Sequence, residues 1–301
     1  MQDDRSPDDL ARKRARMLIA FAVACLAMLA ILYLVAVHTA WGQRVDDAAL
    51  DGRTMRPGVL HATDRLLNTI SIASLALGSA AVMVLAVLRR RPHLAVTSGT
   101  VILGANISTQ VLKRVVLGRV DLVGRPEVLG ASFPSGHSTV AMSLAVALVL
   151  VVPARARLGA AFGGLAYATL VGVGTVTAGW HRPSDVIGAY LVVMVWAGAA
   201  VALLLGTEGT LRVRPARLIA RVPSLSPFFG GIGVGLLLGA MIGVAGTLVA
   251  AREQQVDVVQ LGAAYAASVA TITGVALVLV MALFWLLRDL SLDPPGTGDD
   301  G

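Results

Sequence analysis

Residues 185–205 of this chain read DVIGAYLVVMVWAGAAVALLL, and after the opening aspartate the stretch carries no charged residue. A helix that crosses the hydrocarbon layer of a bilayer needs about 20 mostly apolar residues, so the stretch predicts a membrane-spanning helix. Eight such runs occur in all, at about 17–37, 67–88, 94–112, 136–152, 158–179, 185–205, 229–250 and 262–287. Their continuity predicts helices, because a membrane β-barrel would show short alternating segments. We therefore predict an all-α fold, a polytopic membrane helix bundle.

The composition of the 301-residue chain supports this prediction. Hydrophobic residues make up 56% and charged residues 14%, whereas soluble domains carry about 25% charged residues. This excludes a disordered chain and argues against a soluble one. The net charge of +7 would suit nucleic-acid binding or cationic loops at the cytoplasmic leaflet. Because the charges lie between the apolar runs, we predict a protein of the lipid bilayer that binds no nucleic acid.

One set of linkers between the predicted spans is rich in arginine. Its basic residues are Arg12, Lys13, Arg14, Arg16, Arg89, Arg90, Arg91, Arg155, Arg157, Arg212, Arg214, Arg217, Arg221 and Arg288. The positive-inside rule places this set in the cytoplasm, and both termini with it. The remaining linkers, at 38–66, 113–135, 180–184 and 251–261, are then extracytoplasmic. A cleaved signal peptide is the alternative for the N-terminus, although the apolar run is long for one.

The spans also divide the chain into parts. We predict a cytoplasmic basic N-terminus (1–16), a six-span core (17–205), a cytoplasmic linker (206–228), a two-span C-terminal extension (229–287) and a disordered tail (288–301). In the extension, Gly235, Gly239 and Gly243 recur at four-residue spacing. This spacing favours a helix-packing face, because the strand–turn–helix context of a nucleotide-binding loop is missing.

Two of the extracytoplasmic linkers hold the residues that could carry chemistry. The first ends in the string PSGH at Pro134–His137, which opens the fourth span, and the second reads WHRPSD at Trp180–Asp185. The basic residues of the first linker are Lys113, Arg114, Arg119 and Arg125. Both linkers are predicted on the same face of the membrane, so two histidines, an aspartate and several cations should meet at one depth.

This combination predicts a site for a tetrahedral oxyanion such as phosphate. Arginine can grip phosphate with two parallel hydrogen bonds, and the free N–H groups at a helix start favour an anion. Ser135 and Gly136 stand at such a start, where Gly136 permits close approach of the backbone. The cationic candidates are Lys113, Arg119 and Arg182, with Arg125 and Arg114 as further candidates.

The two histidines are the candidate catalytic groups. His181 and Asp185 are four residues apart and share a helix face, so Asp185 can orient His181 and leave its other ring nitrogen as a nucleophile. His137 can supply a proton to the leaving oxygen at neutral pH. Alternatively, either histidine is an ordinary interfacial side chain. We predict no metal or other cofactor, because two histidines and one aspartate are few ligands and the arginines would repel a cation.

These residues resemble the type-2 phosphatidic acid phosphatase family, whose motifs are K-x6-R-P, P-S-G-H and S-R-x5-H-x3-D. Pro134–His137 matches the second motif in full, and His181 and Asp185 match the H-x3-D of the third. The resemblance covers about residues 60–205. It implies that His181 attacks phosphorus to form a phosphohistidine, that Asp185 orients it, that His137 protonates the leaving group, that Ser135 binds phosphate, and that no metal takes part.

The sequence departs from these motifs in two places. Lys113 and Arg119 are separated by five residues rather than six, and Val120 stands where the family has proline, so that Arg125 is an alternative source of the guanidinium. In the third motif Gly174 and Thr175 replace S-R. Arg182, next to His181, is a candidate substitute for the missing arginine.

From these observations we predict a multi-pass protein of the cell membrane that hydrolyses a lipid phosphate at an extracytoplasmic site. A phosphate monoester or diphosphate of a polyprenyl or phosphatidic lipid is the expected substrate. Three alternatives remain open at this point: a lipid phosphotransferase that uses the same phosphohistidine, a degenerate lipid-binding protein without catalysis, and a transporter. The spans lack the mid-membrane charges that transport paths usually show. The sequence predicts no oligomeric state.

Overall fold

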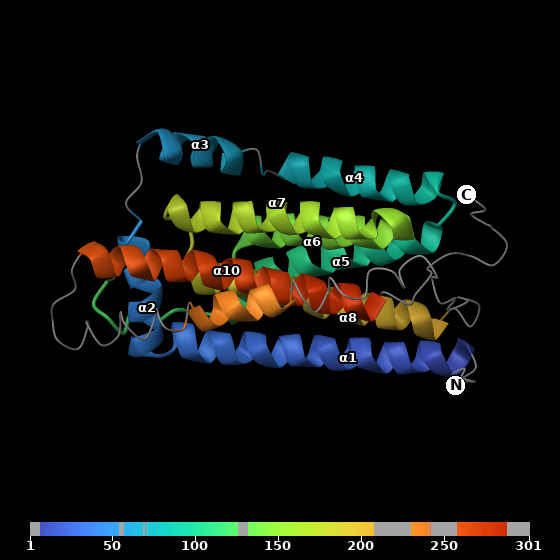
Figure 1. The fold of residues 1–301 in the computed structure, drawn as a ribbon, viewed down its shortest axis with the longest axis horizontal. Coiled ribbons are helices and arrows are strands. Elements are labelled where there is room, and N and C mark those ends of the chain that lie inside the picture. The colour runs from blue at the N-terminus through green and yellow to red at the C-terminus, as the bar shows by residue number, and fades with distance from the viewer. Residues whose placement is uncertain are drawn as a thin grey trace.

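The computed structural model describes residues 7–53, 57–68, 70, 72–125, 132–207, 230–239, 241 and 258–287. Every regular element within these residues is a helix, which confirms the all-α prediction. The elements are α1 (Pro7–Leu32), η1 (Tyr33–Val37), α2 (Ala40–Asp51), α3 (Pro57–Asn68), α4 (Ile72–Leu88), α5 (Pro92–Val111), η2 (Leu112–Val116), α6 (Gly136–Val151), η4 (Ala154–Ala156), α7 (Arg157–Thr177), α8 (Pro183–Thr207), α10 (Val258–Leu287) and a short helix at Gly230–Gly239 (Figure 1).

Four of the described helices are long and apolar enough to cross a bilayer. They are Asp9–Val37, Arg157–Thr177, Pro183–Gly206 and Val259–Leu287, and three shorter apolar helices lie within other predicted spans, at Ala73–Leu88, Gly136–Val151 and Gly230–Gly239. The long apolar helices are those of a membrane protein, but the count of eight spans is not confirmed. Half of the predicted seventh span lies outside the described residues, as do positions 208–228 of the linker and the tail.

Helix α8 is the centre of the bundle, as its uninterrupted apolar sequence suggests. It packs against α1 along its length and also against α5, α6 and α10. Residues on several faces of α8 are buried, since the consecutive residues Tyr190, Leu191 and Val192 are each at most 3% exposed. At Gly198 an added Cβ would lie 2.8 Å from the carbonyl oxygen of Leu18, so glycine permits the close approach of α1. The central helix fixes the position of the residues at its start.

The predicted extracytoplasmic loop 38–66 is not a plain loop, because it contains the helices α2 and α3. Helix α2 runs across the end of the bundle, at a steep angle to α1 (Figure 1). It begins after Thr39, whose side chain accepts a hydrogen bond from the Gly42 N–H at 2.9 Å, which is a standard helix N-cap. The prediction missed it because a twelve-residue helix with charged residues resembles a linker when only long apolar runs are sought.

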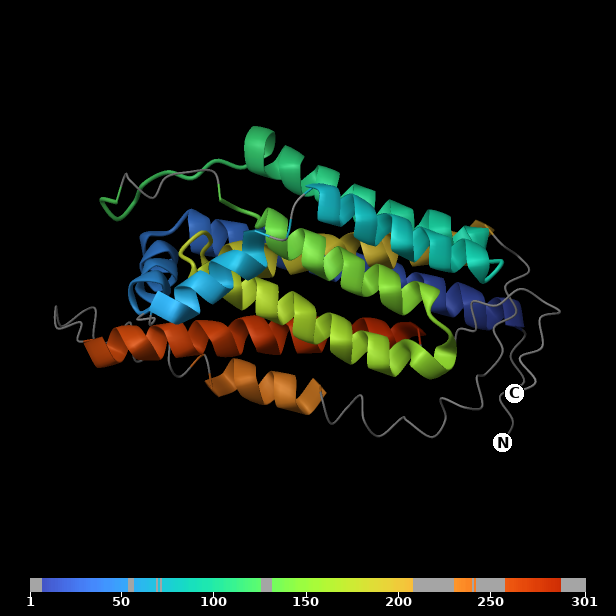
Figure 2. The same cartoon turned by 90° about the horizontal axis from the view of Figure 1, so that it is seen from above.

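The two ends of the bundle differ in their charged residues. At one end, the Arg14 guanidinium lies 5.3 Å from the ring centroid of Trp285. Arg157 lies at the same end, close enough to Arg89 and Arg91 for electrostatic repulsion. At the other end lie α2, the segment that follows η2 and the turn between α7 and α8 (Figure 2). Among the described residues, these arginines therefore lie at the opposite end from the chemistry-bearing linkers. The side of the membrane that each end faces stays a prediction.

Candidate active site

The turn between α7 and α8 places His181 and Asp185. Gly179 adopts a positive φ of 76°, and the N–H groups of Trp180 and His181 donate to the carbonyl oxygen of Thr175 at 2.9 and 3.2 Å. Pro183 then begins α8, as suits its fixed φ. The Nδ1 atom of His181 lies 3.3 Å from Oδ2 of Asp185. The sequence-predicted pair is therefore in contact.

Asp185 is fully buried, and among the described residues only one of its two carboxylate oxygens is hydrogen-bonded. Its Oδ2 atom also accepts the backbone N–H of Arg182 at 2.9 Å. Its Oδ1 atom is buried and has no hydrogen-bond partner among the described residues. A buried carboxylate with one oxygen unsatisfied is unusual. This orientation leaves Nε2 of His181 as the ring nitrogen that is not engaged by the carboxylate.

The PSGH string is joined directly to the start of α8. Ser135 is the N-cap of α6, and its backbone N–H donates to the carbonyl oxygen of Asp185 at 2.9 Å. Its hydroxyl oxygen accepts from the N–H and the hydroxyl of Ser138, at 3.4 and 3.0 Å. The hydroxyl hydrogen of Ser135 therefore remains available for an anion. Gly136, the first residue of α6, leaves the helix start open to close approach.

The two histidine rings face each other across this junction. The ring centroids of His137 and His181 lie 6.4 Å apart with an interplanar angle of 61°. Trp180 lies beside them, with its ring centroid 5.4 Å from that of His137. Two imidazoles at this separation can contact one phosphoryl group from two sides. The two linkers do meet at one end of the bundle, as predicted.

Near these groups, Arg119 has a side chain that is buried about as deeply as that of Arg182. Its side chain is 5% exposed, and Nη2 lies 3.8 Å from Oδ2 of Asp46. Neither Nη1 nor Nη2 has a hydrogen-bond partner within the part of the chain that the structure describes. Asp185 and Arg119 also interact electrostatically. A guanidinium has five N–H donors, so this one retains donors for an anion.

The other predicted cations differ in their surroundings. Lys113 in η2 is half-buried, and burial lowers the pKa of its ammonium group while the Asp185 carboxylate opposes that shift. Arg114 is exposed. Arg125 forms a bidentate ion pair with Asp51 of α2, with N–O distances of 2.8 and 3.1 Å. Lys113 is thus near the histidine pair, whereas Arg125 is engaged at the surface.

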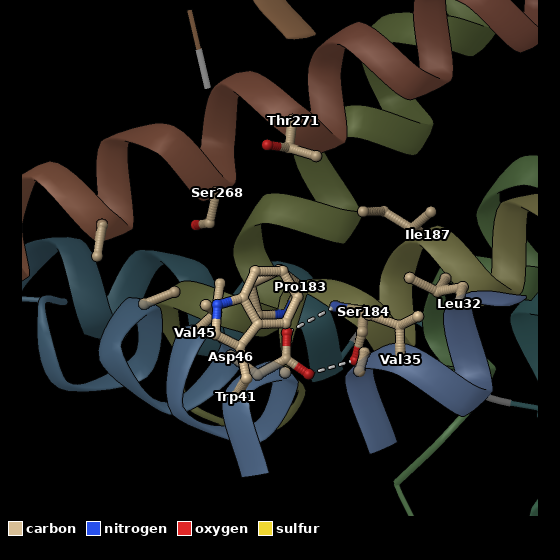
Figure 3. A pocket seen from close by; sticks show the side chains of 14 residues that line it. Leu32, Val35, Trp41, Val45, Asp46, Pro183, Ser184, Ile187, Ser268 and Thr271 are labelled. Carbon is tan, nitrogen blue, oxygen red and sulfur yellow. Dashed lines mark hydrogen bonds between the residues drawn. The ribbon is translucent and has the colours of Figure 1, made fainter. Parts of the chain in front are cut away.

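Helix α2 brings two acidic residues to the site that sequence reasoning missed. Asp47 accepts a hydrogen bond from Nε of Arg182 at 2.8 Å, and both side chains are buried. Asp46 accepts from the N–H of Ser184 at 3.2 Å and from its hydroxyl (Figure 3). The signal that could have found them is the adjacent pair of acids in a chain with only 18 acidic residues. Arg182, predicted to bind phosphate, has its Nε committed to Asp47.

Asp46 borders an apolar cavity of about 240 Å³ that lies between α1, η1, α2, α8 and α10. Trp41, Val45, Ile187 and Leu32 are among its lining residues (Figure 3). Burial, followed by the nearby Asp185 carboxylate, raises the pKa of Asp46 to about 7. Burial disfavours the charged form of a carboxyl group, so this acid changes charge near neutral pH.

The structure shows the surroundings of Thr175, one of the two departures from the third motif. Thr175, in the place of the expected arginine, is buried and donates its hydroxyl hydrogen to the carbonyl oxygen of Gly172 at 2.8 Å. The Arg53 guanidinium lies against Gly179, where an added Cβ would approach its Cζ to 2.7 Å. The position that carries arginine in the family therefore supplies no charge here, and Arg53 is a neighbouring cation that sequence reasoning did not consider.

Long apolar helices with paired imidazoles, a buried carboxyl group and a buried guanidinium at one end define a membrane protein with a site suited to phosphate. Residues 65–207 match the family model of the PAP2 superfamily, which supports the assignment expected from the motifs. The matched superfamily implies a hydrolase activity of the phosphatase type. Comparisons with curated proteins and with solved structures gave no significant match. The matched segment ends with α8, so α1, α2 and α10 lie outside it.

Proposed function

We propose that this protein is an integral-membrane lipid phosphate phosphatase. It hydrolyses the phosphate monoester or diphosphate of a polyprenyl or phosphatidic lipid through a phosphohistidine, at the extracytoplasmic face of the cell membrane. The observation that carries the proposal is the histidine pair: His137 and His181 are 6.4 Å apart, and Nδ1 of His181 is oriented by Asp185. The motif strings, the superfamily match and the apolar helices all agree with it.

In the first step, Nε2 of His181 attacks phosphorus in line with the leaving oxygen. The new P–N bond forms as the P–O bond to the lipid breaks. His137 gives its proton to the departing oxygen, which leaves as the lipid alcohol or lipid phosphate. Asp185 accepts the Nδ1–H of His181 and stabilises the positive charge that develops on that ring, which is the role of the carboxylate in hydrolytic triads.

In the second step, water attacks the phosphohistidine. His137, now neutral, takes a proton from the water, the P–N bond breaks, and inorganic phosphate leaves with both rings restored. The same residue serves first as acid and then as base, as the reversal of a proton transfer requires. An acceptor alcohol in place of water would give a phosphotransferase, so products are to be analysed with and without added alcohol.

The equatorial oxygens of the phosphoryl group need cationic and N–H donors, because charge builds up on them in the transition state. Arg119 has unpaired donors, Lys113 supplies a second charge, and the first turn of α6 supplies free N–H groups beside the Ser135 hydroxyl. Arg182 contributes through the backbone N–H that it donates to Asp185. We assign phosphate binding first to Arg119, Lys113 and the start of α6.

A lipid substrate suits the location of these groups. The site lies at the end of a bundle whose long helices are apolar enough to span the bilayer. An amphiphile can therefore present its phosphate at this end while its hydrocarbon chain stays in the membrane. A water-soluble phosphate would gain nothing from this arrangement.

The proposal is tested by phosphate release from a panel of polyprenyl diphosphate, polyprenyl phosphate and phosphatidic acid, with purified protein in micelles. We expect release by the wild type in the presence of a metal chelator. His181→Ala should lower kcat by at least about 10³-fold, because the nucleophile is lost, and His137→Ala by about 10²–10⁴-fold, because the general acid is lost.

The matched control is His61→Ala, which removes an exposed imidazole from α3 and should retain full release. Radiolabelled phosphate should remain on the wild-type protein after rapid denaturation and be absent from His181→Ala. Folded His181→Ala that releases phosphate at the wild-type rate would refute the nucleophile assignment. Loss of activity in chelator, restored by a divalent cation, would refute metal independence.

A further inference from the structure

Arg119 is held near the histidines by charge rather than by hydrogen bonds. Its side chain is nearly fully buried, and Nη1 and Nη2 have no hydrogen-bond partner among the described residues. Two carboxyl groups attract it: Oδ2 of Asp46 lies 3.8 Å from Nη2, and Asp185 interacts with it electrostatically. A buried guanidinium whose terminal donors are unsatisfied is costly unless a ligand completes it. These donors therefore fit a bound anion.

Asp46 is the partner that controls this guanidinium. Its Oδ2 atom accepts a hydrogen bond from the Ser184 hydroxyl and also forms the ion pair with Arg119. Its Oδ1 atom accepts a hydrogen bond from the Ser184 N–H. Ser184 directly precedes Asp185, so α2 is connected to the start of α8 at the catalytic pair. Helix α2 lies outside the segment that matches the superfamily, so the family resemblance does not account for this carboxyl group.

We propose that Asp46 is a positioning residue that holds Arg119 at the phosphate site and, when it ionises, competes with the bound phosphate for that guanidinium. The proposal rests on the proposed function in assigning Arg119 to phosphate, and it adds a control on anion affinity that is built into α2. A neutral Asp46 leaves the full charge of Arg119 to the anion. An ionised Asp46 neutralises part of that charge, so Arg119 attracts the phosphate less strongly.

The surroundings of Asp46 support a change of charge near neutral pH. On its other side is the apolar cavity, whose lining residues from η1 and α10 carry no charge in the described part of the chain. The charged groups around it are Arg119 from the linker after η2, Asp185 from α8, and the buried pair of Asp47 and Arg182 next to it. Burial and Asp185 raise the pKa of Asp46 to about 7.

The direction of the pH effect follows from this pKa. Below pH 7 the carboxyl group is mostly protonated, so Arg119 faces the anion alone and phosphate binding is strongest. As pH rises through 7 the carboxylate forms and binding weakens. The phosphate itself also titrates in this range, so the contribution of Asp46 must be measured as a difference from a variant that cannot ionise.

The test is direct binding of inorganic phosphate to the purified protein in micelles, by calorimetry, at about pH 5.5 and about pH 8.5. The proteins are wild type, Asp46→Asn, Arg119→Ala and the double variant. The asparagine keeps an oxygen for Ser184 but has no charge. The ratio of the wild-type Kd to the Asp46→Asn Kd should be near 1 at the lower pH and about tenfold at the higher.

In the Arg119→Ala background the same Asp46→Asn change should give a ratio near 1 at both pH values, because the coupling requires both partners. Asp64→Asn, the same change on α3, should follow the wild type throughout. The proposal is overturned by a ratio independent of pH, by a pH effect that survives Arg119→Ala, or by wild-type protein that binds no phosphate. Binding needs no turnover, so this result is separate from the phosphatase assay.

Discussion

The histidine side of the candidate site and its cation side are held in place by different kinds of interaction. His181 lies in the turn just before α8 and Asp185 lies in the first turn of α8, and a backbone hydrogen bond from Ser135 to Asp185 joins them to the start of α6. The cation side depends on a distant part of the chain, because Arg119 is flanked by Asp46, and Arg182 is paired with Asp47. The histidine side depends mainly on interactions at the start of α8, and the cation side depends on carboxyl groups from α2.

This difference teaches which changes should affect chemistry and which should affect assembly. On the histidine side, a substitution removes a reacting or orienting atom and leaves the backbone frame in place. On the cation side, a substitution in α2 leaves every reacting atom present but removes the partner that holds it. Surface pairs on the same side should matter least, because exposed ion pairs contribute little.

The largest expected effect is on the histidine side. Asp185→Asn should lower kcat by about 10³-fold or more, because an amide in this place no longer stabilises the imidazolium and can favour the wrong tautomer of His181. Lipid-phosphate release measures the change, and thermal unfolding shows whether the variant folds. Asp64→Asn on α3 serves as the matched control. A loss below tenfold would mean that His181 does not depend on this carboxylate.

An intermediate effect is expected from the pair that ties α2 to α8. Asp47→Ala should lower the free energy of unfolding by about 3 kcal/mol, because a buried charge on Arg182 loses its carboxylate partner. Unfolding by denaturant in micelles measures it. Asp47→Asn should lose less, since the amide oxygen still accepts a hydrogen bond. Equal losses of unfolding free energy in Asp47→Ala and in the control Asp64→Ala would contradict the role of the pair.

The smallest effect is expected at Arg125, which shares the first-motif linker with Arg119 but is paired with Asp51 at the surface. Arg125→Ala should change kcat/KM by less than about threefold and the free energy of unfolding by less than about 1 kcal/mol. Both assays above measure it. A fall in kcat/KM as large as that expected of a lost oxyanion donor, about 10²–10³-fold, would instead make Arg125 the phosphate-gripping arginine.

The sequence predicted the parts of this molecule that depend on neighbouring residues. A long apolar run identified α8, and the spacing of His181 and Asp185 was enough to predict the contact of their side chains at the start of this helix. The string PSGH correctly marked the start of α6. These features are local, because helix periodicity and N-capping act within about one turn.

What the sequence could not predict depends on contacts between distant segments. Asp47 lies 135 positions before Arg182 and Asp46 lies 138 positions before Ser184, and nothing in their own sequence identifies those partners. Arg182 was expected to bind phosphate because it adjoins His181, yet its Nε is turned to Asp47. The count of eight spans is also not confirmed, and α5 contains polar residues such as Thr97 and Asn106.

The contacts of helix α2 determine how far the chain can be truncated from its N-terminus. A fragment that starts at residue 65, where similarity to the superfamily begins, would keep both imidazoles and Asp185. It would lack the two carboxyl groups that hold Arg119 and Arg182, and also α1, which packs along α8. The functional unit is therefore larger than the recognisable one, and expression work should retain the chain from its first helix onward.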